Sequence, residues 1–310
     1  MQNEPPGNDS SFQNKVEEWL RKEGYPLEFA TASAFRQAGF RVRQGEHVRN
    51  PDTGVVREID VVASIDGFVG DQIVRLSYII ECKWSKNKPW IIFTSMHHRI
   101  APGACIAQTI GSDLGRAALW CVAGNSALHQ TSTFSTPDGA GFGARQAFSD
   151  GKDVCYSALQ SVVSAARLRA MYYETPSRDP KHLPRVSFVA LPTVVVDGAL
   201  FEAYFDEDSG ELKTHPANAV RLHWRGAESW QHFATVDVVA ASYLNEFLAK
   251  RAEESTVIIN ALVGATTNIA ECFAVGNLDA LKYERASRGI VGLPPLLAHL
   301  AKKVDQAPPA

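Results

Sequence analysis

The segment Glu81-Cys82-Lys83 places an acid and a base two residues apart, directly after the apolar run 76–80. Side chains along a strand alternate between the two faces of a sheet, so Glu81 and Lys83 point to one face and Cys82 to the other. An acid and a base held side by side at a strand end can bind a divalent metal ion and place a water beside it. This is the minimum equipment for metal-assisted hydrolysis of a phosphodiester bond.

A second acidic segment, Glu58-Ile59-Asp60, lies one strand earlier and leads into the apolar run 61–63. Glu58 and Asp60 share a face of this strand, so either carboxylate could accompany Glu81. We prefer Asp60, because the apolar run follows it directly and places it where the strand enters the core.

Helical spacing and turn signals predict the elements around these acids. The first half of the chain is expected to contain a helix at 12–22, a helix that starts at Pro26 and ends at Gly39, strands at 40–49, 55–64 and 72–84, and a loop that begins at Asp66-Gly67. Residues 86–150 are less regular, with one helix near 113–122 and a glycine-rich stretch at 139–143. They are interpreted as an insertion.

The second half is expected to begin with a long helix at 156–173, where apolar residues repeat at helical spacing. A short strand at 185–190 follows. The Asp197-Gly198 pair is a two-residue turn signal and predicts a hairpin between 193–196 and 199–204. Further strands are predicted at 220–224 and 233–239, then a helix at 240–252 and a mostly helical remainder.

A helix, a β-hairpin with Asp60 on its second strand, and a third strand that ends in Glu81-Cys82-Lys83 resemble the PD-(D/E)XK nuclease superfamily. The helix 156–173 and the strand 185–190 look like the crossover helix and the next parallel strand of that restriction-endonuclease-like fold. The resemblance covers roughly residues 12–205, with 86–150 set aside. Ile59 stands where the proline of the family motif would precede the aspartate.

The resemblance implies roles for these residues. Asp60 and Glu81 would bind Mg²⁺ or Mn²⁺, with the backbone carbonyl of Cys82 as a third protein ligand. Lys83 would orient or deprotonate the attacking water and lie against the scissile phosphate. Glu28 matches a frequent acid of the first helix of the family. Gln160 matches a polar position of the crossover helix, where it would position the substrate.

Composition limits the partners and the compartment. The 310 residues carry a net charge of −3 with a pI near 6.3, so any positive charge that binds nucleic acid must be local. Candidates around the acidic segments are Arg41, Arg43, Arg49, Arg57, Lys86 and Lys88. Trp84 and Trp90 are interleaved with the lysines, as in a surface that binds the backbone and stacks bases, and solvated lysines beside core tryptophans are the alternative. Five cysteines without metal-site spacing predict reduced, mostly buried thiols, and no apolar stretch is long enough to span a membrane. A cytoplasmic protein is expected.

The sequence therefore predicts an α/β protein with a mixed central sheet flanked by helices. Residues 12–250 would form a nuclease-like domain containing the insertion, and 251–310 a helical extension that packs on it. The expected function is Mg²⁺-dependent hydrolysis of nucleic acid, DNA rather than RNA, in restriction, defence or repair. Two alternatives stay open: a catalytically silent nucleic-acid-binding or scaffold protein with this fold, and an interaction protein whose surface carries these charges. A homodimer or a protein partner is also left open.

Overall fold

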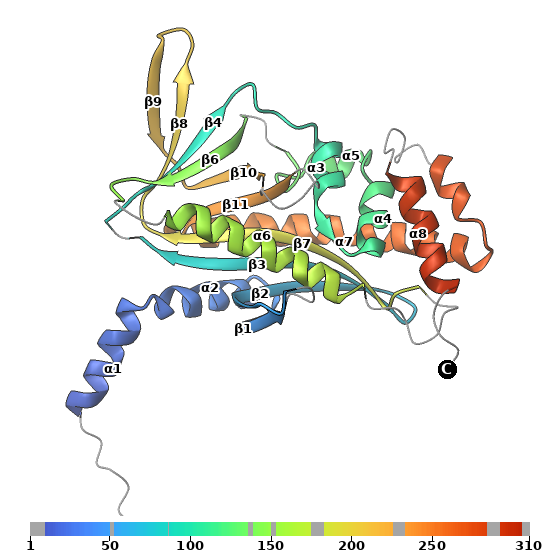
Figure 1. Ribbon diagram of the computed structural model, residues 1–310, viewed down its shortest axis with the longest axis horizontal. Helices are drawn as coiled ribbons and strands as arrows, with labels where there is room; N and C mark the ends of the chain where they lie inside the picture. Colours follow the sequence, from blue (N-terminus) through green and yellow to red (C-terminus); the bar gives the residue numbers. More distant parts are fainter. Residues whose placement is uncertain are drawn as a thin grey trace, which may run out of the picture.

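The computed structural model describes residues 10–49, 53–85, 87–135, 139–149, 153–174, 183–225, 233–283 and 292–305. These residues form a mixed α/β structure built on one large sheet with helices on both faces (Figure 1). Ten strands follow each other in the order β1-β2-β3-β7-β11-β10-β6-β4-β8-β9, and an eleventh, β5, pairs with β7. The sequence expectation of a mixed sheet flanked by helices is confirmed at this level.

Two helices precede the sheet. Helix α1 (Ser10–Lys22) projects away from the body, whereas α2 (Tyr25–Gln37) lies along the sheet (Figure 1). Gly24 joins them with φ of 88°, a left-handed conformation that a residue with a side chain rarely adopts. Pro26 stands in the first turn of α2, where its missing N–H leaves no hydrogen bond unmade. The predicted starts of both helices are therefore close to those observed.

The first half of the sheet is a meander joined to a long parallel strand. Strands β1 (Arg41–Arg49), β2 (Val56–Val69) and β3 (Gln72–Trp84) pair antiparallel in sequence order. Strand β7 (Val186–Asp197) then pairs parallel with β3 over the whole stretch from Ile73 to Trp84. Strand β3 has neighbours on both sides, and most of its residues are buried.

The second half continues with β11 (Ala234–Ala240), β10 (Ala219–Trp224), β6 (Ala140–Gln146), β4 (Trp90–Ser95), β8 (Leu200–Asp206) and β9 (Glu211–Pro216). The segment 86–150, interpreted from sequence as an insertion, thus contributes β4 and β6 to the sheet itself. It also supplies α3 (Pro102–Gln108), β5 (Ile110–Gly111), α4 (Asp113–Cys121) and α5 (Ser126–His129).

Three apolar clusters hold the layers together. Helix α6 (Val154–Tyr172) covers one face of the sheet, and α2 covers the opposite face with the first half of α7 (Leu244–Ala274). The second half of α7 forms a third cluster with α4, the 3₁₀ helix Leu278–Tyr283 and α8 (Leu293–Asp305) (Figure 1). Helix α7 runs continuously past residue 250, so the boundary expected there falls inside a single core helix.

The glycine-rich stretch that was expected to be irregular is strand β6. A Cβ on Gly141 would come within 2.6 Å of Ile92 on β4 and 2.8 Å of Leu222 on β10. The glycine therefore allows side chains of both neighbouring strands to meet across β6.

The loop predicted at Asp66-Gly67 is wrong, because β2 continues through both residues to Val69. Asp66 is neutralised there by Arg75, with Nε–Oδ1 at 2.7 Å. A Cβ on Gly67 would lie 2.5 Å from Val263 of α7, so the glycine marks the close approach of a helix to a strand rather than a turn.

The predicted break in β7 and the predicted hairpin are also wrong. Strand β7 is continuous, and β8 pairs with β4 and β9 instead of β7. Pro192 does not interrupt the strand, because β5 pairs with β7 up to Ala190 and β11 pairs with it only from Thr193. The missing N–H thus falls in the gap between two neighbours. Asp197-Gly198 does turn the chain, but toward another part of the sheet.

The segment Ala241–Ala274, which includes α7, is long and apolar enough to cross a membrane by length and composition alone. The sequence expectation that no stretch has this property is therefore wrong. In the structure, the buried residues of α7 pack on the sheet and on α4, and Arg251 and Glu254 lie buried within the same helix. About a third of the apolar window of this segment, 33%, is buried against the rest of the chain.

We predict that Gly115→Ala on α4 lowers the free energy of unfolding by about 1–3 kcal/mol, because an added Cβ would lie 2.1 Å from the backbone oxygen of Phe188. The matched control is Gly264→Ala on α7, where no atom lies within 4 Å of the added carbon. The control should be stabilised by about 0.5–1 kcal/mol through helix propensity. Urea denaturation of both variants measures the two effects, and equal changes would contradict the described packing of α4 on β7.

Candidate functional site

Glu81 and Lys83 lie on one face at the carboxyl end of β3. Glu81 is buried, and its Oε1 lies 2.5 Å from Nζ of Lys83. Cys82 points to the opposite face, where it is buried in the cluster around α2 and its thiol contacts Oγ1 of Thr31 at 3.6 Å. Burial raises the pKa of the Cys82 thiol well above its usual range. The expected division of the segment between two faces is confirmed, and Cys82 is a core thiol.

The side chain of Asp60 is hydrogen-bonded to the backbone of β3. The pairing of β2 with β3 extends from Val61 opposite Ile80 to Val69 opposite Gln72. Asp60 immediately precedes the first paired residue of β2, Val61. There the carboxylate of Asp60 accepts a hydrogen bond of 2.7 Å from the backbone N–H of Cys82. Glu58, the alternative acid, is exposed to solvent. The geometry therefore favours Asp60 as the carboxylate that accompanies Glu81.

The charge of Asp60 is poorly compensated. Burial raises its pKa from the ordinary 3.8 to about 7, and the negative charge of Glu81 acts in the same direction. The hydrogen bond from Cys82 and the charge of Lys83 lower the pKa without offsetting these causes. Perturbed carboxyl groups of this kind gather at functional sites because a ligand supplies the missing charge.

Glu28 belongs to the same group of charges. Burial raises the pKa of Glu28, and Glu58 and Glu81 raise it further, whereas Lys83 lowers it. The pKa of Lys83 lies above its ordinary value, because the attraction of Glu81 and Asp60 outweighs the effect of burial. Lys83 is therefore a protonated ammonium near neutral pH. Among the described residues, the four carboxylates of Glu28, Glu58, Asp60 and Glu81 thus influence one another at the end of β3, and Lys83 is the lysine that acts on them.

Gln160, the fifth residue expected at the site, lies half-buried on α6. No hydrogen bond or ion pair joins it to the acids among the contacts of the described residues. The structure thus brings together Glu28, Asp60, Glu81 and Lys83, and it leaves the role of Gln160 as a prediction.

The donor atoms at this position fit a hard divalent cation in part. Two carboxylates and a backbone carbonyl are oxygen ligands, which Mg²⁺ and Mn²⁺ prefer, and the excess of negative charge favours a cation. Within the described ranges, however, no group of three or more His, Cys, Asp or Glu side chains is arranged to hold a metal ion. A cation here would depend on Asp60, Glu81, a backbone carbonyl and water molecules.

The positive charges expected around the site are mostly engaged. Arg41 pairs with Asp66 and Arg43 with Glu46, each at 2.8 Å. Arg49 donates to the backbone oxygen of Gly54, and Lys88 is exposed. Lys86 lies outside the described residues.

The two tryptophans of the predicted stacking surface differ. Trp84 is 49% exposed at the end of β3, whereas Trp90 is fully buried on β4. The expectation that both line a nucleic-acid surface is therefore wrong for Trp90, whose ring fills the core beneath α6.

A cavity of about 730 Å³ lies away from the acids, between the carboxyl end of α6, α4 and α8. Trp120, Arg116 and His299 are among its lining residues. Asp60, Glu81 and Lys83 do not line it, so the acid group sits at an open strand end rather than in this cavity.

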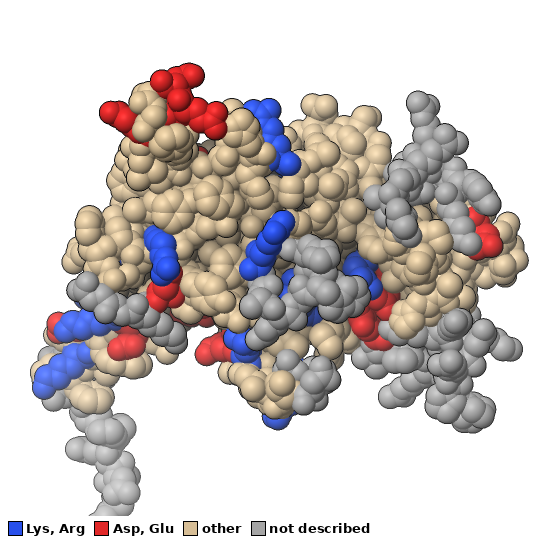
Figure 2. Space-filling view, turned by 45° about the horizontal axis from the view of Figure 1, so that its top comes forward, with Lys and Arg blue, Asp and Glu red and all other residues tan. Residues whose placement is uncertain are grey.

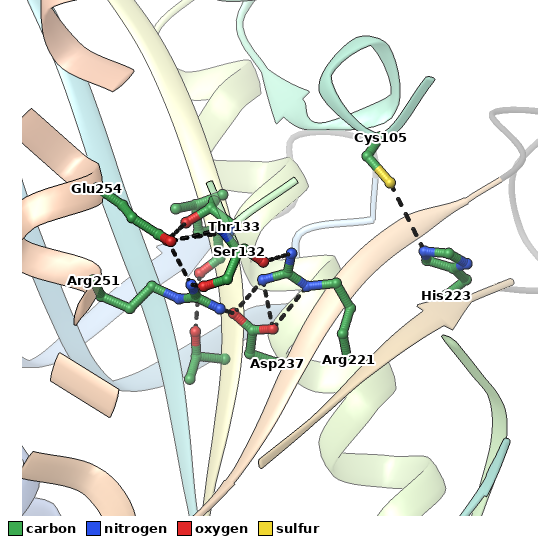
Figure 3. Close-up of polar contacts among 10 residues, drawn as sticks. Cys105, Ser132, Thr133, Arg221, His223, Asp237, Arg251 and Glu254 are labelled. Carbon is green, nitrogen blue, oxygen red and sulfur yellow. Dashed lines mark hydrogen bonds and ion pairs between the residues drawn. The ribbon is translucent and has the colours of Figure 1, made fainter. Parts of the chain in front are cut away.

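A buried ion network was not anticipated from sequence (Figure 3). Arg221 of β10 makes a two-pronged contact with Asp237 of β11 at 2.8 and 2.9 Å, and Arg251 of α7 contacts Asp237 at 3.1 Å. Arg251 also pairs with Glu254, whose carboxylate accepts hydrogen bonds from the backbone of Ser132 and Thr133. The sequence signal was an aspartate inside the apolar run 234–240. This network fastens the loop before β6 to the sheet and to α7.

The charges of the network are balanced. The attraction of Arg221 and Arg251 outweighs the burial of Asp237 and holds the pKa of its carboxyl below the usual range. Two arginines and two carboxylates thus neutralise one another, so this network is a structural clamp and not a second acid site.

Comparisons of the chain with protein-family models, curated proteins and solved structures found no match. The functional argument therefore depends on the residues and geometry described above.

We predict that Asp60→Asn stabilises the metal-free protein and that the gain is greater at pH 8 than at pH 5. A carboxyl with a pKa near 7 in the folded state and about 3.9 when unfolded binds more protons when folded, so its ionisation destabilises the fold as the pH rises toward 7. Asparagine keeps an oxygen for the Cys82 N–H and removes this dependence. Thermal unfolding in EDTA at both pH values measures the gain.

The matched control for this prediction is Asp66→Asn. Hydrogen bonds from Arg75 and its positive charge outweigh burial and lower the pKa of Asp66, so its charge stabilises the fold above the unfolded pKa. The control should lose stability at both pH values. If Asp60→Asn gave the same gain in stability at pH 5 and pH 8, the raised pKa of Asp60 would be contradicted.

Proposed function

We propose that this chain is a metal-dependent nuclease with a restriction-endonuclease-like core, and that it hydrolyses phosphodiester bonds of nucleic acid, DNA in preference to RNA. The observation that carries the proposal is the meeting of Asp60, Glu81 and Lys83 at the end of β3. Asp60 touches the backbone of Cys82, and Lys83 touches Glu81. Three residues from two separate motifs thus converge on one strand end.

The arrangement of the core supports the same reading. The meander β1-β2-β3 is followed, after intervening elements, by helix α6 and by strand β7, which pairs parallel with β3. This order matches the hairpin, motif strand, crossover helix and parallel strand expected from the resemblance. Helix α2, which carries Glu28, covers the face opposite to α6.

The chemistry follows from the charges of the site. A bound Mg²⁺ or Mn²⁺ would activate a water molecule and offset the charge that builds on the phosphate oxygens. Asp60 and Glu81 would hold the cation, and Glu28 would contact it through water. Because the pKa of Lys83 is raised, its ammonium would orient the water and bind the scissile phosphate rather than remove a proton.

We predict that the purified protein cleaves nucleic acid only in Mg²⁺ or Mn²⁺, and that Asp60→Asn, Glu81→Ala and Lys83→Ala each reduce the rate by about 100-fold or more. Plasmid, linear duplex, single-stranded DNA and RNA are incubated with and without the metals. Circular dichroism establishes that each variant is folded.

Glu58→Gln is the control for this experiment, because Glu58 shares a strand face with Asp60 but is exposed. It should keep most of the activity. Full cleavage by folded Glu81→Ala would refute the proposed site, and loss of activity in Glu58→Gln with retention in Asp60→Asn would move the metal ligand by two positions.

We predict that Mn²⁺ stabilises the wild type by about 2.7 kcal/mol at a hundredfold excess over its dissociation constant. The double variant Asp60→Asn/Glu81→Gln should gain nothing. Protons compete with the metal for Asp60, so the stabilisation of the wild type should be greater at pH 8 than at pH 6. Thermal shift with Mn²⁺ titration measures this effect. Equal stabilisation of wild type and double variant would place the metal elsewhere, and stabilisation without cleavage would favour a catalytically silent protein.

A further inference from the structure

Three exposed aromatic side chains lie around the junction of α1 and α2 and at the end of β3. Trp19 is 53% exposed, Tyr25 38% and Trp84 49%. The rings of Trp19 and Tyr25 have centroids 5.9 Å apart. We call these three residues the aromatic platform. Large aromatic side chains gathered on a surface indicate a binding function more often than a packing function.

The aromatic platform lies at the same end of β3 as the acid group, with Trp84 on the face of the strand opposite to Lys83. Trp84 follows Lys83 in β3, and a Cβ built on Gly24 would lie 3.7 Å from Cβ of Trp84, so the start of α2 rests against the end of β3. Glu28 lies one helical turn after Tyr25, and its pKa responds to Lys83 and Glu81. The aromatic rings and the acids therefore share one end of the sheet.

Two lysines flank the outermost ring, within a segment that also carries Glu17, Glu18 and Glu23. Lys15 and Lys22 lie four residues before and three residues after Trp19, so all three side chains occupy neighbouring positions on one face of α1. Lys22 pairs with Glu18 at 2.8 Å, an exposed contact that a phosphate can replace at little cost. Figure 2 shows lysine and arginine side chains on this projecting helix.

The hairpin of β8 and β9 is mainly acidic instead. The turn between β8 and β9 carries Asp206, Glu207 and Asp208, and Figure 2 shows the acidic side chains gathered there. Exposed aromatic rings also occur near this turn, such as Phe205 at 63% exposure, but without a flanking pair of lysines. A polyanion would therefore favour the aromatic platform over this hairpin.

We propose that the aromatic platform stacks the bases of single-stranded nucleic acid and leads the strand to the acid group, so that the substrate is an unpaired segment. This inference rests on the proposed nuclease function for its substrate class. Aromatic rings bind the faces of bases, and these faces are free only where a strand is unpaired. Lysines at the same surface bind the backbone phosphates. Rings, lysines and the phosphodiester site then contact successive parts of one strand.

The test measures binding separately from cleavage. Fluorescein-labelled oligo(dT), oligo(rU) and a duplex of equal length are titrated with the protein in EDTA, and anisotropy reports the dissociation constants. The wild type should bind the single strands more tightly than the duplex. Trp84→Ala and Trp19→Ala should each weaken single-strand binding about fivefold or more, because each variant loses a ring on which a base can stack. The oligo(dT) and oligo(rU) arms distinguish DNA from RNA.

Two further variants separate stacking from other causes. Trp84→Phe keeps a ring and should restore most of the affinity, whereas Phe205→Ala removes an equally exposed ring from the acidic hairpin and should change nothing. Mn²⁺ stabilisation of Trp84→Ala shows that the neighbouring acids remain in place. Unchanged affinity in both tryptophan variants, or equal loss for single strand and duplex, would overturn the proposal.

Size-exclusion chromatography of Trp19→Ala tests the competing occupant, a second copy of the chain packed on α1. A dimer that dissociates in this variant while its single-strand affinity stays unchanged would assign the exposed face of α1 to dimerisation and overturn the platform. Failure of the platform proposal can also be distinguished from failure of the nuclease proposal. Single-strand binding with the expected losses but without metal-dependent cleavage would keep the platform and refute the nuclease.

Discussion

The parallel pairing of β3 with β7 is the constraint on which the rest of the structure depends. It aligns Ile73–Trp84 with Val186–Asp197 and ends where Glu81 and Lys83 stand. Its two faces carry the apolar clusters under α6 and under α2 with α7. Because β3 is held on one side by β7 and on the other by β2, its carboxyl end is a fixed support. The acid group is therefore built on rigid strand backbone rather than on a loop.

Two of the buried or half-buried charge groups among the described residues differ in their balance. Around Asp237, two arginines meet two carboxylates, and the pKa of Asp237 is lowered. Around Asp60, several carboxylates share one lysine, and burial raises the pKa of Asp60 to about 7. A balanced buried group mainly fixes the geometry of the fold, whereas an unbalanced one stores an unfavourable charge that a cation can relieve. This contrast is the physical reason for assigning chemistry to the second group alone.

Local patterns predicted the part of the fold next to the site. The bounds of β3 are those expected, since its apolar run and the Trp84 end are encoded in consecutive residues. The division of Glu81 and Cys82 between faces follows from strand alternation, whereas the preference for Asp60 over Glu58 came from the apolar run 61–63 directly after Asp60.

Contacts between distant segments could not be predicted in this way. Gly67 was expected to start a loop and Gly141 to lie in an irregular stretch, but Gly67 allows the close approach of α7 and Gly141 that of side chains from the neighbouring strands. The strands predicted at 185–190 and 193–196 are one strand, in which Pro192 falls between two of the partners of β7. The clamp around Asp237 joins residues from β10, β11, α7 and the loop before β6, so no short sequence window contains it. Each of these features is decided by which segment lies alongside, information that a local pattern does not hold.

The pairing of β3 with β7 also has a consequence for how the chain folds. More than a hundred residues separate the two strands, and β4, α3, α4, β6 and α6 all lie between them. Closing so long a loop costs conformational entropy before the parallel contacts can offset that cost. A high contact order and slow folding are therefore expected. During synthesis, β3 emerges without its central neighbour and keeps one edge unpaired until β7 has been made. The strand that carries Glu81 and Lys83 is thus exposed to mispairing during that interval.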